Sequence, residues 1–89
     1  MVSKTIKVTN EDGLHARAAA LFVRVSNQFN SEITLKAHNN SVNGKSIIGV
    51  MSLGVFSGED VEIICYGEDE EDALIALTNL IESNFKELR

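Results

Sequence analysis

The sequence predicts an α+β domain in which an antiparallel sheet carries helices on one of its faces. Three observations lead to this prediction. Short segments that alternate between apolar and polar residues are typical of half-buried strands, and segments with apolar residues at helical spacing are typical of amphipathic helices. Along the chain these segments follow the order strand, helix, strand, strand, short helix, strand, helix. This order suits an antiparallel sheet with its helices packed on one face.

The first strand and the first helix are predicted in the N-terminal third of the chain. Residues 4–8 alternate, with Ile6 and Val8 on the same face, which is typical of a strand. Residues 10–13 follow as a turn, because asparagine, aspartate and glycine favour turns. The apolar run after this turn predicts a helix from residue 16 to about residue 27.

A β-hairpin is predicted in the middle of the chain. Ile33, Leu35 and Ala37 alternate with polar residues, which predicts the second strand. Residues 38–40 form a polar turn, and the short segment 41–43 is then the returning strand of the hairpin.

A short helix, a strand and a longer helix complete the predicted order. The short helix runs from residue 47 to residue 53 and ends at Gly54, because glycine is common just after helix ends. A turn at residues 57–58 leads into a strand at residues 61–66. The last helix begins near residue 70, where an acidic run suits the positive end of the helix dipole. Its apolar stripe consists of Ala73, Leu74, Leu77, Leu80, Ile81, Phe85 and Leu88.

Size and composition predict one domain that covers residues 1–89. Of these residues 44% are hydrophobic and 24% are charged, which are ordinary proportions for a globular domain. No apolar stretch approaches the roughly 20 residues that a membrane-spanning helix needs, and the N-terminus lacks the apolar core of a signal peptide. We therefore expect a cytoplasmic protein that does not insert in a membrane.

Net charge and isolated ligand-type residues argue against several function classes. The net charge of −5 and the lack of an aromatic stacking platform argue against nucleic-acid binding, which needs a basic surface. Cys65 is the only cysteine, so no disulfide forms within the chain, and its apolar strand predicts a buried, unreactive thiol. His38 has no cysteine, aspartate or second histidine at ligand spacing. We therefore expect His38 to be a surface turn residue, and we expect neither a metal nor a cofactor.

The first candidate site is the segment Gly-Leu-His-Ala-Arg at residues 13–17. His15 lies at or near the start of the predicted helix, and Arg17 follows two residues later. The first N–H groups of a helix have no intrahelical partner, and the dipole makes that end positive, so it can bind an anion. A histidine there can carry a phosphoryl group on a ring nitrogen, while the N–H groups and Arg17 hold the phosphoryl oxygens. The alternative for His15 is an ordinary solvent-facing helix cap.

A second motif lies at residues 43–54, Asn-Gly-Lys-Ser-Ile-Ile-Gly-Val-Met-Ser-Leu-Gly. Together with residues 13–17, it strongly resembles HPr, the histidine-containing phosphocarrier of the bacterial sugar phosphotransferase system. The resemblance covers essentially the whole chain, and two motifs at a fixed separation are more specific than either alone. It implies a four-stranded open-faced sandwich with three helices on one face. The serine of the second motif is similar to that of HPr from low-GC Gram-positive bacteria.

The resemblance implies a phosphoryl-group carrier and not an enzyme. His15 would accept the group through Nδ1 from Enzyme I and pass it to EIIA domains of sugar permeases, while Arg17 would stabilise the phosphoryl oxygens. Ser46 would be phosphorylated by HPr kinase/phosphorylase, and the catabolite control protein would be a further partner. By itself, Ser46 before an apolar helix predicts an N-cap. The two interpretations are compatible, because a phosphate is tolerated at a helix N-terminus.

An apolar surface beside His15 is the predicted docking site for these partners. The first helix is apolar nearly all round, so part of it is expected to be exposed, although burial in the core is the usual fate of such residues. Arg24 would add positive charge toward an acidic partner surface. We expect the protein to be a monomer. The predicted partner-binding residues are Ala16, Ala20, Leu21, Arg24, Ile47, Ile48 and Met51.

Ala18 departs from the pattern of the HPr family, which normally has proline at this position. Alanine keeps the helix, lets its first turn fray more and adds a backbone donor near the phosphoryl site, so we predict an altered transfer rate and not a lost function. The alternative function is a regulatory HPr-like module that acts mainly through phosphorylated Ser46 as a catabolite-repression cofactor. Relatives of that kind lack the acceptor histidine, so the presence of His15 favours the carrier.

Overall fold

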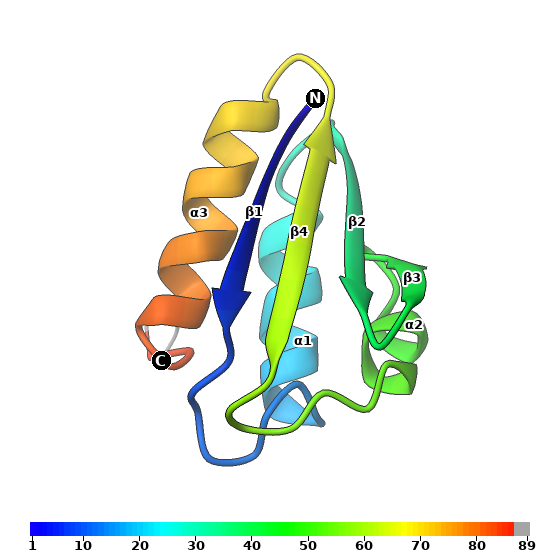
Figure 1. Ribbon diagram of the computed structural model, residues 1–89. Helices are drawn as coiled ribbons and strands as arrows, with labels where there is room; N and C mark the ends of the chain where they lie inside the picture. Colours follow the sequence, from blue (N-terminus) through cyan, green and yellow to red (C-terminus); the bar gives the residue numbers. More distant parts are fainter. Residues whose placement is uncertain (87–89) are drawn as a thin grey trace.

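A four-stranded antiparallel sheet forms one layer of the molecule (Figure 1). The computed structural model describes residues 1–86. Its strands are β1 (Val2–Lys7), β2 (Glu32–Ala37), β3 (Asn40–Asn43) and β4 (Asp60–Tyr66). In space their order is β1-β4-β2-β3, so the last strand of the chain lies between the first two. All three pairings are antiparallel.

Three helices form the second layer, α1 (Arg17–Ser26), α2 (Ile47–Ser52) and α3 (Glu70–Glu82). Figure 1 shows α1 behind the sheet, α3 beside β1 and α2 near the short strand β3. α3 packs on β1 and β4, and α1 contacts both of the other helices. The predicted α+β open-faced sandwich, with its element order, is therefore confirmed.

The core lies between the sheet and the helices, because the strands alternate as the sequence predicts. One face of the sheet buries the apolar residues, and polar residues such as Lys7 and Lys36 remain exposed on the other. α1 and α3 bury their apolar stripes against this face. The buried strand residues are Ile6, Ile33, Leu35, Ala37, Val61, Ile63 and Cys65.

Several element boundaries differ from the prediction by one or two residues. β1 begins at Val2, because its first residues pair with the end of β4, a contact that alternation alone does not reveal. α1 begins at Arg17 and not at residue 16, because Ala16 has a positive φ of 46° that no right-handed helix can contain. Phe85 is buried but follows the end of α3. Leu88 of the predicted stripe lies outside the described residues.

The acidic run at the start of α3 opens the helix, as predicted. Asp69 is its N-cap, and its first turn carries Glu70, Glu71 and Asp72. The Asp69 carboxylate also accepts hydrogen bonds from the backbone N–H groups of Asn30 and Ser31 and from the Ser31 hydroxyl. Hydrogen bonds from the Ser31 side chain and the Asn30 backbone hold the pKa of Asp69 below its ordinary value. This residue therefore ties α3 to the connection between α1 and β2.

Cys65 is fully buried on β4, as its apolar strand predicts. Burial, together with the nearby carboxylates of Glu70 and Asp69, raises the pKa of its thiol to about 11. Because the thiolate is the reactive form of cysteine, this thiol is unreactive in the folded chain. Within residues 1–86, every helix is too short or too polar to cross a membrane.

Candidate functional site

The backbone before His15 is held by a distant part of the chain. The Leu14 N–H donates to the Val55 carbonyl at 3.0 Å, and the Leu14 side chain is buried. Gly13 has a φ of 67°, and a Cβ at this position would lie 2.4 Å from the Val55 oxygen. Only glycine meets both conditions, because it accepts a positive φ and leaves room for the close approach. The turn is closed by Asn10, whose amide Nδ2 donates to the Gly13 carbonyl at 2.8 Å.

A tight turn connects His15 to α1. The Ala18 N–H donates to the His15 carbonyl at 3.1 Å, which is the hydrogen bond that closes a four-residue turn. Ala16, the second residue of this turn, has φ 46° and ψ −108°. These angles are close to those of the first central residue of a type II′ turn, where glycine is strongly preferred. The alanine is therefore held in a strained conformation next to the candidate site.

The Ala18 N–H is not available to a phosphoryl group. We expected alanine in place of proline to add a donor near the site, but the His15 carbonyl accepts that hydrogen bond. Within residues 1–86, the N–H groups of Ala16 and Arg17 make no hydrogen bond. In the same part of the chain the Ala19 N–H also lacks a hydrogen bond, but the two donors next to His15 are the ones best placed to hold an anion on its ring.

The His15 and Arg17 side chains are both exposed, so partners can reach them. The N-cap of α1 is Ala16, with no hydrogen bond from a side chain. His15 therefore lies near the helix start, as predicted, but its ring makes no capping hydrogen bond. The imidazole is therefore exposed to a docked partner.

His15 and Arg17 line an open depression of about 1130 Å³. The preceding turn contributes to it, and so do two segments whose proximity to His15 the sequence does not reveal: the segment between α2 and β4 and the end of the described chain. In the sequence, Gly13 is the indication that another backbone segment approaches the turn before His15 closely. The lining residues outside the predicted site are Asn10, Glu11, Asp12, Leu14, Ala18, Gly54, Val55, Phe56, Asn84, Phe85 and Lys86.

Ser46 caps α2 in the ordinary way. It has extended backbone angles, φ −113° and ψ 117°, and its Oγ accepts the Gly49 N–H at 3.0 Å. The predicted N-cap is therefore confirmed. Its side chain is half-buried, and α2 packs against α1, the helix that follows His15.

The predicted docking residues differ in how much surface they offer. Ile48 is 82% exposed and Ile47 is also exposed, whereas Met51 is half-buried. Leu21 is only 8% exposed because α1 turns this side chain toward the core, so it offers little surface, although it lines the depression beside His15. Phe56, which is not among the predicted docking residues, is 70% exposed and lines the His15 depression. The remaining predicted positions, Ala16, Ala20 and Arg24, are exposed.

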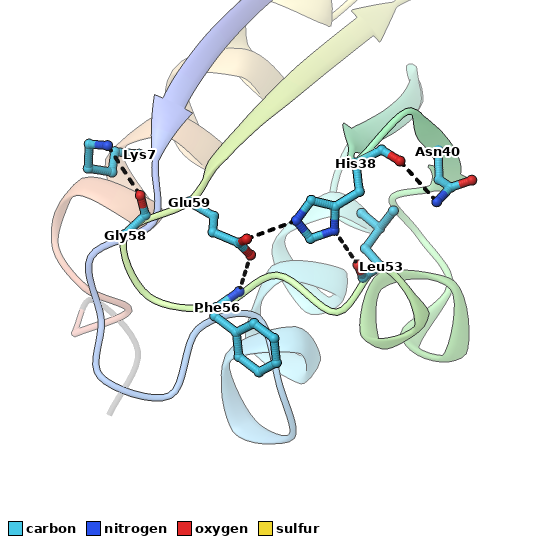
Figure 2. Close-up of polar contacts among 7 residues, drawn as sticks. All are labelled: Lys7, His38, Asn40, Leu53, Phe56, Gly58 and Glu59. Carbon is cyan, nitrogen blue, oxygen red and sulfur yellow. Dashed lines mark hydrogen bonds and ion pairs between the residues drawn. The ribbon is translucent and has the colours of Figure 1, made fainter.

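His38 is exposed in the turn between β2 and β3, as predicted, but it has a partner that the sequence did not reveal. Figure 2 shows its ring between the Leu53 carbonyl and the Glu59 carboxylate. The hydrogen bond with Glu59 is the main cause that raises the pKa of His38 above its ordinary value of 6.5. Hydrogen bonds from the Phe56 N–H and from His38 lower the pKa of Glu59. Within residues 1–86, no three His, Cys, Asp or Glu side chains gather as potential metal ligands.

Comparison with known proteins places this geometry in a family. The family described as "PTS HPr component phosphorylation site" matches residues 2–83. The chain belongs to the HPr family. This match confirms the predicted family. HPr proteins are phosphocarriers of the phosphotransferase system. The chain is 42% identical over 87 residues to the phosphocarrier protein HPr of Treponema pallidum. The matched region covers 98% of this chain and 99% of that protein.

Further similar proteins include one named HPr-like and two solved structures of HPr. The chain is 46% identical over 82 residues to the HPr-like protein Crh of Halalkalibacterium halodurans, which covers 92% of this chain and 98% of that protein. Among solved structures, HPr-C-His from Thermoanaerobacter tengcongensis has 49% identity, full coverage of both chains and a TM-score of 0.95. An HPr dimer from the same organism has 50% identity, covers 98% of this chain and 100% of that chain, and has a TM-score of 0.78.

Proposed function

We propose that this chain accepts a phosphoryl group on His15 from Enzyme I and passes it to EIIA domains of sugar permeases in the cytoplasm. The observation that carries the proposal is the position of the exposed His15 directly before two unpaired N–H groups, those of Ala16 and Arg17. Family membership supports it, because HPr proteins are phosphocarriers.

Neutral imidazole suits such a carrier for two reasons. Its unprotonated ring nitrogen is a nucleophile near neutral pH, and the phosphorylated ring is a good leaving group. We propose Nδ1 of His15 as the accepting atom. Its lone pair forms the bond to phosphorus while the bond between phosphorus and the donor breaks. In the transfer to EIIA the same steps run with this chain as the donor.

Arg17 and the start of α1 stabilise the phosphoryl oxygens in this proposal. The guanidinium of Arg17 presents several N–H donors in a planar arrangement that matches two phosphoryl oxygens at once. The N–H groups of Ala16 and Arg17, at the positive end of the helix, add directed hydrogen bonds. Because the chemistry itself needs little more than positioning and charge stabilisation, these groups suffice once the partner is docked.

Docking is proposed at the apolar surface next to this site. Ile47 and Ile48 are exposed on α2, and exposed apolar side chains that gather on one surface mark interaction sites. Arg24 lies on α1 and is exposed as well. Its charge would attract an acidic partner and raise the association rate.

Ser46 is proposed as a regulatory phosphorylation site for HPr kinase/phosphorylase. A phosphate on its Oγ would stand at the start of α2 and would place charge directly before Ile47. The helix tolerates this charge, but a docking surface that prefers an acidic partner would not. Phosphorylation is therefore expected to slow transfer from Enzyme I and to create a surface for the catabolite control protein.

A purely regulatory module is the second candidate. The similarity to Crh of Halalkalibacterium halodurans favours it, and it would act through phosphorylated Ser46 alone. The exposed His15 favours the carrier instead, because a module of that kind does not need an acceptor histidine.

Phosphorylation by phosphoenolpyruvate and Enzyme I, followed by intact-mass measurement, tests the carrier role. We expect one acid-labile phosphoryl group on the chain and none on the His15→Ala variant. The Ala18→Pro variant in the same assay measures what the departure from the family residue does to the rate. If the chain remains unlabelled while another HPr is fully labelled, the regulatory module is the better description.

Two further measurements complete the test. Incubation with ATP and HPr kinase/phosphorylase is expected to add one acid-stable phosphate that the Ser46→Ala variant lacks. Sedimentation equilibrium at several concentrations is expected to give a monomer. A concentration-independent dimer would contradict that part of the proposal and would match the dimer solved for the Thermoanaerobacter tengcongensis relative.

A further inference from the structure

His38 contacts hydrogen-bond acceptors through both of its ring nitrogens. Its Nδ1 lies 3.1 Å from the Leu53 carbonyl oxygen, and its Nε2 lies 3.0 Å from a Glu59 carboxylate oxygen. Figure 2 shows the ring between these two groups, which come from the end of α2 and from the segment before β4. The ring therefore connects the turn between β2 and β3 to both ends of the segment 53–59.

Both contacts are hydrogen bonds only when the ring is protonated. A neutral imidazole carries one N–H, whereas the imidazolium carries two. Neither a backbone carbonyl nor an ionised carboxylate can donate in return. Protonation of His38 therefore adds one hydrogen bond and one opposite-charge contact to this corner of the molecule.

The other charged groups around His38 are already paired or belong to the sheet. Glu59 is the charged group in contact with the ring. On β2, Lys36 lies opposite Glu62 of β4 in the sheet register, and Asp60 contacts Lys7 of β1. α2 contributes no charge, because the sequence Ile47–Ser52 has no ionisable side chain. The Glu59 carboxylate is thus the group whose charge decides the state of His38.

The segment that His38 contacts is the one that holds the backbone before His15. The second oxygen of Glu59 accepts the Phe56 N–H at 2.7 Å. The next residue toward α2, Val55, accepts the Leu14 N–H at 3.0 Å. One imidazolium therefore joins Leu53 and Glu59, and the carbonyl between them positions the residue before the phosphoryl acceptor.

We propose that His38 is a positioning residue which, when protonated, fixes the segment 53–59 and through Val55 the turn that presents His15. The direction of the pH dependence follows from the raised pKa of His38. The pKa of His38 in the folded chain is above 6.5, so the stabilisation is fully present below the unfolded-state value and is lost as the pH rises through the folded-state value. Its consequence for phosphoryl transfer rests on the proposed function, whereas the restraint of the backbone does not.

Amide hydrogen exchange measured by NMR tests the restraint without any phosphoryl transfer. The chain has two histidines, so the His15→Ala variant leaves His38 as the only one that titrates. In that background, we expect the protection factors of the Leu14 and Phe56 amides to fall roughly two- to fivefold as the His38 ring deprotonates, a change typical of an exposed ion pair.

The control is the double variant His15→Ala/His38→Asn. Asparagine suits the positive φ of 54° at this position and the type I′ turn of the hairpin, but it cannot titrate. We expect the two protection factors to be independent of pH in this variant. The proposal is overturned if they change with pH equally in both backgrounds, or if the His38 ring titrates at or below about pH 6.5.

Phosphoryl uptake measures the consequence separately. At low pH the full-length chain should accept the group faster than its His38→Asn variant, and the ratio of the two rates should fall toward 1 as the pH rises. A ratio that stays constant across the His38 titration contradicts the functional part. Absence of uptake in both chains contradicts the carrier role, while the exchange data still decide whether the restraint exists.

Discussion

The two candidate modification sites both lie at the start of a helix, but they are built in opposite ways. Ser46 has ordinary extended angles, and its own hydroxyl oxygen caps α2 by accepting the Gly49 N–H. At the start of α1, Ala16 has a positive φ and caps nothing with its side chain. There the backbone is held instead by Val55, far along the chain.

The difference is between a site that neighbouring residues form and a site that depends on contacts between distant segments. A serine before an apolar run is sufficient to cap a helix, so the Ser46 site is encoded by neighbouring residues. The backbone around His15 depends on the packing of the segment between α2 and β4. We infer that changes to this segment disturb the His15 turn, whereas the Ser46 cap responds only to changes in its own few residues.

The largest expected effect is that of Gly13→Ala. The new Cβ would lie 2.4 Å from the Val55 oxygen at a φ of 67°, so either the strain persists or the contact between the two segments breaks. We expect a loss of about 3 kcal/mol in the free energy of unfolding, measured by urea denaturation. Gly54→Ala is the matched control, since it has φ 65° with nothing within 4 Å of the added Cβ. Its expected loss is only about 1 kcal/mol. Equal losses in the two variants would show that the contact with Val55 does not contribute to the free energy of unfolding.

A smaller effect is expected at the local cap. Ser46→Ala removes the acceptor of the Gly49 N–H and should lower the free energy of unfolding by about 1 kcal/mol. Ser46→Asp keeps a side-chain acceptor at the same position and should lose less than half of that amount. Urea denaturation of both variants measures the difference. If the amide exchange of Leu14 also changes in Ser46→Ala, the cap of α2 is coupled to the turn before His15 and is not local.

The smallest effect, and the one with opposite sign, is expected for Ala16→Gly. Glycine adopts φ 46° and ψ −108° without the steric cost that alanine has, although it gains entropy in the unfolded chain. The net expectation is a gain of about 0.5 kcal/mol in the free energy of unfolding. Ala20→Gly is the control, because Ala20 lies in the middle of α1 and should lose about 1 kcal/mol. If Ala16→Gly is also destabilising, the turn is not strained.

The parts of this structure that are predictable from the sequence are those that neighbouring residues determine, as at Ser46. Alternation and helical periodicity predict the element order, because burial on one face imposes them locally. The Ser46 cap follows from its neighbours. Three features instead depend on segments that meet only in the folded chain. They are the burial of Leu21, the positive φ of Ala16 and the pairing of His38 with Glu59. Gly13 indicates that the backbone is unusual there, but it does not identify Val55 as the neighbour.

The strand order β1-β4-β2-β3 has a consequence for how this chain is made. Among the strands of residues 1–86, β1 pairs only with β4, and β2 pairs with β4 and β3. While the ribosome is still synthesising the chain, the first strand therefore has no partner until Asp60 has emerged, and its pairing is complete only with Cys65. The hairpin of β2 and β3 is marginal by itself, so the nascent chain has little that can fold stepwise. Val55 emerges after β3 and α2, so the backbone before His15 can reach its final geometry only once that later segment has been made.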